Sequence, residues 1–335
     1  MFQPKRVIFE KVALEYKTGR DMLEYFKDKD IQLIYSKSGR VTQIPGDTAS
    51  KMYFEGKNTL VVGVRKSYKF QSCKPSAHYQ LPLVSGCMGM CEYCYLNTQM
   101  GKKPYIKVYV NIDEILNNAD KYIEDRLPDT TIFEGAATSD PIPVEPYTGN
   151  LGKSISHFGK SNNGYFRFVT KFTDVDDILN LNHNGRTTIR FSVNTNKIIK
   201  QFEHGTPKVE DRIKAAMKVL NAGYNLGFII APVFLYPNWE DEYKVIIDKI
   251  GNSFINSNIS FEIISHRFTK RAKENILTVY PKTILPMEEE IRKFKYGQFG
   301  YGKYLYKDEE INYMKRFFKE NIEKYFHESS INYII

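Results

Sequence analysis

The sequence predicts an α/β fold: a partial (β/α)6 barrel of the TIM type, with an N-terminal accessory segment and a C-terminal hairpin plus helix. Six short apolar runs, rich in β-branched and aromatic residues, carry this prediction; they are residues 79–85, 131–137, 165–171, 188–194, 226–232 and 260–265. Helical stretches separate most of these runs, and this alternation is typical of βα units around a parallel sheet. Six units favour an open barrel over the closed eight-fold form.

Three of the helices are predicted from apolar residues at helical spacing. The first follows Asn111, a candidate N-cap residue with Glu114 three positions later. The second covers residues 211–221, and Gly223 is its expected stop. The third covers residues 308–326. We interpret their apolar stripes as core packing.

The sequence predicts that the chain has three parts. Residues 1–75 form the accessory segment, with strands of its own such as 58–64, and residues 76–275 form the barrel. Residues 276–335 form a C-terminal part in which aromatic residues and glycines alternate over 296–303, the pattern of an exposed hairpin. A tight turn with packed aromatic side chains is the alternative interpretation of that pattern.

Composition limits the class of protein. The 335 residues include 48 Lys and Arg against 39 Asp and Glu, a net charge of +9. This excess indicates a polyanionic partner such as nucleic acid, although many lysine-rich proteins bind none. The longest apolar run, 228–235, is far too short to span a membrane, and the first residues lack a secretory apolar segment. The sequence therefore predicts a cytoplasmic protein.

Three clustered cysteines are the strongest chemical signal. Cys87, Cys91 and Cys94 have the spacing Cys-x3-Cys-x2-Cys, directly after the first predicted barrel strand. Because barrel chemistry gathers at the C-terminal strand ends, this is where a site is expected. Three thiolates can hold three corners of a cubane iron–sulfur cluster and leave the fourth iron open. Such a site suits S-adenosylmethionine and radical chemistry.

Other uses of the cysteines were weighed against the cluster. Zinc sites favour paired cysteines with a second pair at a distance, but one further cysteine remains, Cys73, and no His pair has finger spacing. Disulfides fit less well, because three neighbouring thiols cannot all pair. A nucleic-acid-binding module with a structural metal is the rival from another functional class.

Several segments resemble the spore photoproduct lyase family. They are 85–98, with Tyr93 before the third cysteine, and 101–111, 136–140, 169–172, 190–195 and 297–304. The match covers most of residues 70–310 in order. It implies a radical S-adenosylmethionine enzyme of the spore core that repairs the methylene-bridged thymine dimer in DNA. Another member of that superfamily, acting on tRNA or a peptide, is the alternative.

The resemblance also implies cofactors and a reaction. Cys87, Cys91 and Cys94 would ligate a [4Fe–4S] cluster, and S-adenosylmethionine would chelate the fourth iron. A 5′-deoxyadenosyl radical would take hydrogen from C6 of the lesion, and the cross-link would break to leave a thymine allyl radical. A reductant such as flavodoxin or ferredoxin would supply the electron to a protein that we expect to be monomeric.

Four strand-end residues are expected to bind the cofactor. Ser139 lies where the superfamily commonly has a Gly-Gly-Glu-like segment, and Lys171 is placed to pair with the cofactor carboxylate. Ser192 and Asn194 are expected to hydrogen-bond the ribose or methionine. Without the resemblance, each would be interpreted as an ordinary strand residue.

One departure from the family concerns the hydrogen donor. Family members carry a cysteine where this sequence has Ala137, so the chain is either an inactivated variant or from a branch with another donor. We hypothesise that Cys73 donates the hydrogen atom, and that Tyr95, with Tyr93, relays a hydrogen back. The alternative for Cys73 is an inert buried thiol.

The lesion must leave the duplex to reach a buried radical. The 296–303 hairpin is expected to contact DNA, with Lys295 and Lys303 neutralising phosphates and Phe299 or Tyr301 entering the base stack. Residues 266–271 add basic charge nearby.

Overall fold

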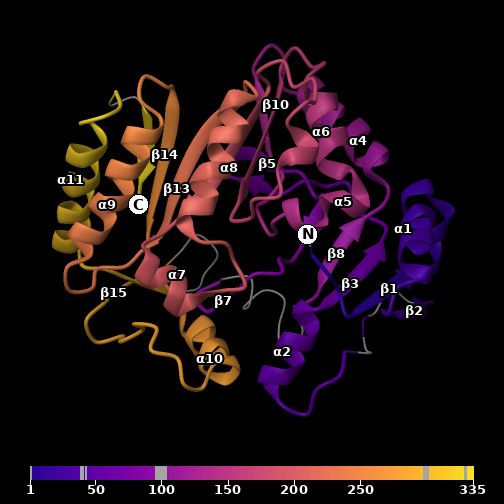
Figure 1. Ribbon diagram of the computed structural model, residues 1–335, viewed down its shortest axis with the longest axis horizontal. Coiled ribbons are helices and arrows are strands. Elements are labelled where there is room, and N and C mark those ends of the chain that lie inside the picture. The colour runs from indigo at the N-terminus through magenta and orange to yellow at the C-terminus, as the bar shows by residue number, and fades with distance from the viewer. Residues whose placement is uncertain (1, 38–40, 42–43, 95–103, 297–301, 328–329) are drawn as a thin grey trace.

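Two sheets organise the chain in the computed structural model, which describes residues 2–37, 41, 44–94, 104–296, 302–327 and 330–335. The larger sheet has the strand order β17-β14-β13-β11-β10-β9-β5-β4 and curls through the left and centre of Figure 1. The smaller sheet, with the order β2-β1-β3-β8-β6, lies at the right.

The larger sheet confirms the predicted six-stranded part of a barrel. Its central strands pair in parallel and follow one another in space; they are β5 (Ala77–Gln80), β9 (Thr131–Glu134), β10 (Gly164–Thr170), β11 (Thr187–Val193), β13 (Asn225–Val233) and β14 (Ile259–Ser265). The antiparallel strand β4 (Ser72–Cys73) extends one edge. At the other edge β17 (Ile331–Ile334) pairs in parallel with β14, an addition that the sequence did not predict.

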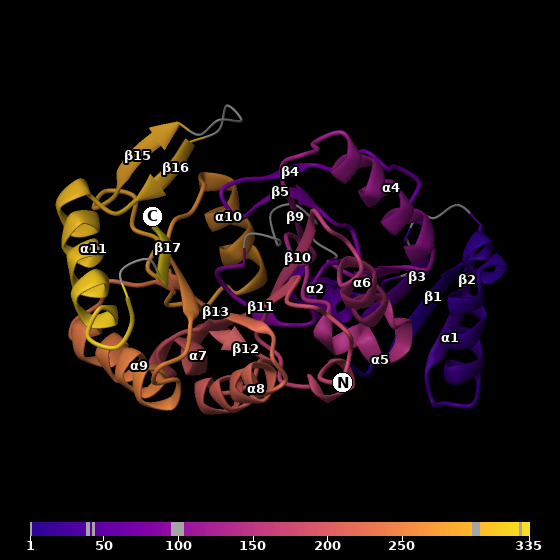
Figure 2. The same cartoon turned by 90° about the horizontal axis from the view of Figure 1, so that it is seen from above.

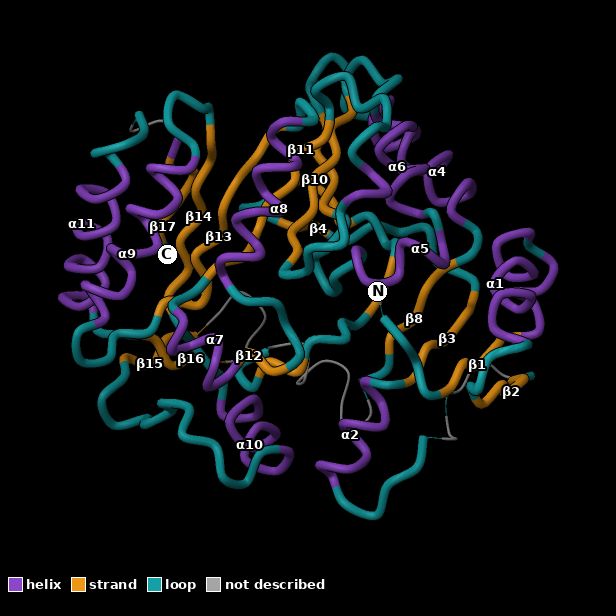
Figure 3. Tube along the Cα trace, viewed as in Figure 1, coloured by secondary structure: helices purple, strands orange, loops and turns teal. Residues whose placement is uncertain are grey.

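Helices cover the outside of the sheets and confirm the three predicted ones (Figure 3). They include α4 (Ile112–Glu124), α5 (Glu145–Thr148), α6 (Asn150–Phe158), α8 (Val209–Asn221), α9 (Trp239–Ser253) and α11 (Asp308–Ile322). Gly223 follows α8 with a φ of 84°, a conformation that glycine adopts readily. Asn111 occupies the N-cap of α4, but its Nδ2 donates to Glu114 (2.8 Å) and its Oδ1 accepts from the Arg65 backbone (2.8 Å).

Most of the buried apolar residues form one large core, and a second, smaller cluster includes Phe234 and Phe268. Phe133, Phe166, Phe168 and Phe191 are at most 1% exposed and lie on neighbouring strands. Each buried aromatic side chain removes a large apolar area from water, so this layer stabilises the curled sheet.

The smaller sheet joins the start of the chain to later residues. The strands β1 (Arg6–Glu10), β2 (Gln32–Ser36), β3 (Thr59–Gly63) and β8 (Ile106–Tyr109) pair in parallel, with α1 (Lys17–Lys27) and α2 (Ala49–Lys57) between them in sequence. The predicted strand at 58–64 is therefore confirmed. Because β8 lies after residue 75, this sheet crosses the predicted boundary, and the division into three parts stays a prediction.

The predicted strand 79–85 is wrong in one respect. It is split into β5, which ends at Gln80, and β6 (Val84–Ser85), which pairs antiparallel with β8 in the smaller sheet. Pro82 lies between them and has no N–H to donate to a continuing ladder. The chain therefore passes from one sheet to the other immediately before Cys87, and the cysteine loop lies at their junction.

The C-terminal hairpin is confirmed as two strands, β15 (Lys293–Tyr296) and β16 (Gly302–Leu305), paired antiparallel. It projects at the upper left of Figure 2. Within the described ranges, no helix is long and apolar enough to cross a membrane.

Candidate functional site

The cysteine loop is fixed from both sides. Its strand β7 (Met90–Cys91) pairs antiparallel with β12 (Glu203–His204), which follows α7 (Asn196–Phe202). The Met90 carbonyl accepts a hydrogen bond from the Tyr280 hydroxyl (2.9 Å), and Tyr280 follows α10 (Lys270–Val279). The loop is thus anchored in the protein scaffold and its cysteines are held in place.

The sulfurs of Cys87 and Cys91 lie close to Gly89. A Cβ atom at Gly89 would lie 3.5 Å from Cys87 Sγ and 3.9 Å from Cys91 Sγ, so both sulfurs face the space that the missing side chain leaves. Cys94 is close enough to act electrostatically on both other cysteines. The structure therefore brings together the three predicted metal ligands.

Three cysteine thiols form the candidate donor set. Within the described residues, no three Cys, His or acidic side chains are close enough to enclose one metal ion. A cubane cluster binds each cysteine to a different iron, which separates the sulfurs more widely than a zinc ion does. Burial raises the pKa of the Cys91 thiol to about 11, so metal binding must supply the energy of deprotonation.

A buried ionic network lies against Cys91. The Lys171 ammonium donates to Glu203 Oε1 (2.6 Å) and to the Tyr93 hydroxyl oxygen (2.6 Å), and Arg212 donates to Glu203 Oε2 (2.6 Å). Burial opposes the charge on Glu203, but the Lys171 and Arg212 cations hold its pKa at about 2. The Tyr93 hydroxyl also donates to Glu203. Lys171, predicted to meet a cofactor carboxylate, is here paired with Glu203.

The other three predicted cofactor-binding residues differ in whether their polar groups already have hydrogen-bond partners. Ser139 forms an isolated bridge with Gly86 beside the cysteine loop, and its buried Oγ has no hydrogen-bond partner in the described part of the chain. Ser192 is buried at the end of β11, and its carbonyl accepts from Arg212 Nη1 (2.9 Å). The Asn194 amide is occupied, because it donates to the Pro232 carbonyl (2.8 Å) and accepts from Tyr243 (2.9 Å). Ser139 is thus the residue best prepared to receive a ligand.

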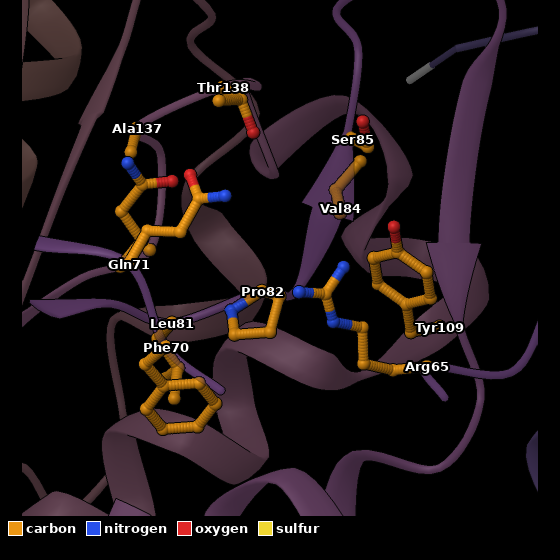
Figure 4. A pocket seen from close by; sticks show the side chains of 12 residues that line it. Arg65, Phe70, Gln71, Leu81, Pro82, Val84, Ser85, Tyr109, Ala137 and Thr138 are labelled. Carbon is orange, nitrogen blue, oxygen red and sulfur yellow. The ribbon is translucent and has the colours of Figure 1, made fainter. Parts of the chain in front are cut away.

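A cavity of about 190 Å³ lies between β6, the strand before the cysteine loop, and the start and end of the β4–β5 hairpin (Figure 4). Its lining includes Ser85, which precedes the loop, Ala137 and Thr138, which follow β9, and Gln71, which precedes β4. Gln71 and Ala137 lie on the same side of the cavity in Figure 4. The position that lacks the family's cysteine therefore faces a space large enough for part of a ligand.

Cys73 lies on β4, in the hairpin that borders this cavity. Burial, followed by the negative charge of Glu134, raises the pKa of Cys73 to about 11. Ser76 Oγ donates to Glu134 Oε2 (2.9 Å), and Arg190 Nη1 donates to Ser76 Oγ (3.2 Å) and Glu262 Oε2 (2.9 Å). This network ties the hairpin to the barrel, and Cys73 keeps its S–H hydrogen at neutral pH.

The predicted DNA-contacting residues are only partly described. Lys295 and Lys303 lie directly opposite each other on β15 and β16, and Tyr296 beside them is 74% exposed. Like charges this close repel each other unless an anion lies between or above them. Tyr95, Phe299 and Tyr301 lie outside the described residues.

Sequence reasoning missed three charged residues of the site: Lys57, Glu203 and Arg212. Arg212 had a readable signal, since it falls on the apolar face of α8 with Val209, Ile213 and Ala216. Glu203 and Lys57 had none, because acidic and basic residues near helix ends are usually solvated.

Comparisons with known proteins agree with one another. A family model described as spore photoproduct lyase matches residues 2–335. The spore photoproduct lyase of Clostridium acetobutylicum is 56% identical over 331 residues, 99% of this chain and 98% of the relative. That of Bacillus subtilis is 45% identical over 336 residues, with the same shares covered.

A solved structure matches at a TM-score of 0.97 and 44% identity, covering 100% of this chain and 99% of its own. It is described as a spore photoproduct lyase double mutant with bound AdoMet and dinucleoside spore photoproduct. In that mutant one cysteine is replaced by alanine and one serine by cysteine. The fold predicted from the sequence, and the resemblance, are thereby confirmed.

Proposed function

The chain belongs to the spore photoproduct lyase family, and from this premise we propose that it repairs the spore photoproduct in DNA as a radical S-adenosylmethionine carbon–carbon lyase. The observation that carries the proposal is the arrangement of one site. The Cys87 and Cys91 sulfurs lie close together beside Gly89, and a cavity of about 190 Å³, lined by Ser85 and Ala137, extends to Gln80 in the hairpin of Cys73.

We assign the cofactor site to the cysteine loop and the neighbouring strand ends. Cys87, Cys91 and Cys94 hold a [4Fe–4S] cluster, and S-adenosylmethionine binds beside it. Together these groups supply, when bound, a carbon-centred radical that abstracts hydrogen from C6 of the lesion. The unpartnered Ser139 hydroxyl supports a contact to the cofactor. Lys171 would exchange its bond with Tyr93 for the cofactor carboxylate while keeping Glu203.

Asn194 and Ser192 have a more limited part in this proposal. The Asn194 amide ties the end of β11 to Pro232 near the end of β13, so its role is to position the strand end next to Ser192. Ser192 remains the proposed contact for the ribose or methionine.

We propose Cys73 as the hydrogen donor that replaces the absent cysteine at Ala137. After C6 abstraction the methylene bridge breaks, and the resulting allyl radical needs one hydrogen atom. Cys73 gives its S–H hydrogen, which completes the thymine methyl group and leaves a thiyl radical. Tyr95, with Tyr93, returns a hydrogen to that sulfur from 5′-deoxyadenosine. Tyr93 must break its bond to Glu203 to take part.

The solved double mutant supports this assignment. Its new cysteine and its new alanine are separated along its chain by the same number of residues as Cys73 and Ala137 are here. The substitutions made in that relative therefore reproduce the pair of residues that this chain carries.

The donor assignment is tested by moving the thiol. We expect Cys73→Ala to consume more cofactor per repaired lesion and to give by-products, because the allyl radical lacks its donor. Adding Ala137→Cys to this variant should restore clean repair. Unchanged product purity and cofactor use in Cys73→Ala would contradict the assignment.

The hairpin and the partners complete the proposal. Lys295 and Lys303 would neutralise phosphates of the distorted duplex while the lesion is flipped into the cavity. Phe299 or Tyr301 would fill the gap that remains. Flavodoxin or ferredoxin would reduce the cluster, and the enzyme would act as a monomer.

The function itself is tested by anaerobic incubation with the dinucleotide lesion, S-adenosylmethionine and a reductant. We expect a thymine–thymine dinucleotide without the methylene cross-link between its bases, and S-adenosylmethionine should be recovered. A colourless protein that holds zinc, or an iron–sulfur protein inert on the lesion but active on tRNA, would contradict the proposal.

A further inference from the structure

Lys57 is a buried cation with no carboxylate partner. It is the last residue of α2, and only 3% of its surface is exposed. Among the described residues, no carboxylate lies within ion-pair distance of its ammonium, whereas Lys171 and Lys107 are both paired with acidic residues. Residues 95–103, which follow the cysteine loop in sequence and lie outside the described ranges, include no acidic residue.

The ammonium of Lys57 points at the cysteine loop. Its Nζ donates to the Cys87 carbonyl at 2.8 Å and to the Gly89 carbonyl at 2.9 Å. One side of the cation faces the Tyr53 ring, whose centroid is 5.4 Å away. Lys57 thus reaches Cys87, a predicted cluster ligand, and Gly89, which lies beside the Cys87 and Cys91 sulfurs.

A structural tie alone does not account for a lysine here. A neutral side chain could donate to the same two carbonyls, whereas removing an ammonium from water costs several kcal/mol unless an anion compensates it. The acidic residue that acts most strongly on Cys87 is Asp140. It is already hydrogen-bonded by Thr170 and the Lys171 backbone (2.8 and 2.9 Å), and it makes no ion pair with Lys57.

The anion that fits is the cluster itself. Three thiolates on a cubane core give it a net negative charge, and reduction adds another. A fixed cation nearby stabilises the reduced form more than the oxidised form, because attraction grows with charge and is weakly screened in a buried site.

We propose that Lys57 is the counter-charge of the iron–sulfur cluster and raises its reduction potential. This inference rests on the proposed function, since it requires a cluster at Cys87, Cys91 and Cys94. It adds a residue that touches neither cofactor nor lesion and acts through the charge that it places behind the cysteine loop.

The test is a redox titration of the reconstituted holoenzyme in which electron paramagnetic resonance measures the reduced fraction of the cluster. We expect the reduced-to-oxidised ratio at a fixed potential to fall about tenfold in Lys57→Met, which corresponds to about 59 mV for one electron. Lys57→Arg should keep the wild-type potential. Lys249→Met is the matched control, because it removes a lysine charge that is paired with Glu210 on the outer helices.

Lys57→Gln separates charge from hydrogen bonding, since its amide is still a donor. A wild-type potential in Lys57→Gln and Lys57→Met would overturn the proposal, and so would loss of the cluster in all three variants at position 57. Loss of the cluster in Lys57→Met and Lys57→Gln, with the cluster retained in Lys57→Arg, would support the proposal. If wild-type protein itself holds no iron and sulfide, the proposed function fails instead.

Discussion

Among the residues around the cysteine loop, Glu203 is the one whose substitution should lower the stability of the protein most. Its side chain is fully buried and accepts from Lys171 and Arg212, both at 2.6 Å, and from Tyr93. Glu203→Gln keeps the shape of the side chain but removes the only acidic partner that the structure gives these two cations within its described residues.

Two routes give the size of the effect. Breaking a buried ion pair by neutralising one partner typically costs about 3–5 kcal/mol. The pKa of Glu203 falls from 4.5 to about 2, and at roughly 1.4 kcal/mol per pKa unit this corresponds to about 3 kcal/mol. We therefore expect Glu203→Gln to lower the free energy of unfolding by about 3 kcal/mol at pH 7.

The pH dependence has a definite sign. Because the folded-state pKa lies below the unfolded value, the stabilisation is complete above about pH 4.5 and is lost as the pH falls toward 2. The difference between wild type and Glu203→Gln should therefore stay constant from pH 7 to pH 5 and shrink below pH 4.5.

Urea unfolding measures this difference, and the single tryptophan, Trp239, is a buried fluorescent probe. Glu210→Gln is the control: its ion pair with Lys249 has the same length, 2.6 Å, but is more than one-third exposed, so we expect a loss below about 1 kcal/mol. Equal losses of unfolding free energy in Glu203→Gln and Glu210→Gln would contradict this prediction. So would a difference between wild type and Glu203→Gln that grows as the pH falls.

Three further predictions concern the loop, the hairpin and the barrel interior. Gly89→Ala should fold but bind less iron, because its methyl group would lie 3.3 Å from Thr206 and 3.5 Å from the Cys87 sulfur. Gly152→Ala in α6, whose methyl group would lie 3.3 Å from Glu145 and far from the cysteines, should keep its iron. Neutralising Lys295 or Lys303 to Gln should reduce the salt dependence of DNA binding by about one unit of slope each, and an unchanged slope would contradict phosphate contact. Arg190→Met should destabilise the chain by about 3–5 kcal/mol in urea unfolding, since it leaves Arg167 as the one cation for the buried carboxylates of Glu134 and Glu262 among the described residues. A loss below about 1 kcal/mol would argue against that network.

The strands of the barrel could be predicted because their signal is local. Short β-branched runs between amphipathic helices specify parallel strands whatever their neighbours are. The strand at 79–85 failed at Pro82, where one residue without an N–H moves the chain to another sheet. The strand β17 could not be predicted, because Ile331–Ile334 becomes a strand only through its distant partner β14.

The site could be predicted only where spacing carries the chemistry. The three cysteines are readable because a cluster requires several thiolates close together. The partners of Lys171, Asn194 and Lys57 depend on which loops fold against one another, and the sequence does not contain that information locally. Lys57 in particular has the appearance of a solvated lysine in the last turn of a helix.

The proposal that Cys73 donates the hydrogen atom is tested most directly by the deuterium content of the repaired thymine after reaction in D2O. A thiol hydrogen exchanges with the solvent, so Cys73 would carry deuterium and deliver it to the thymine methyl group. We expect one deuterium in the product of the wild-type enzyme and none in the product of Cys73→Ala. Repair without deuterium, or no repair at all, would contradict it.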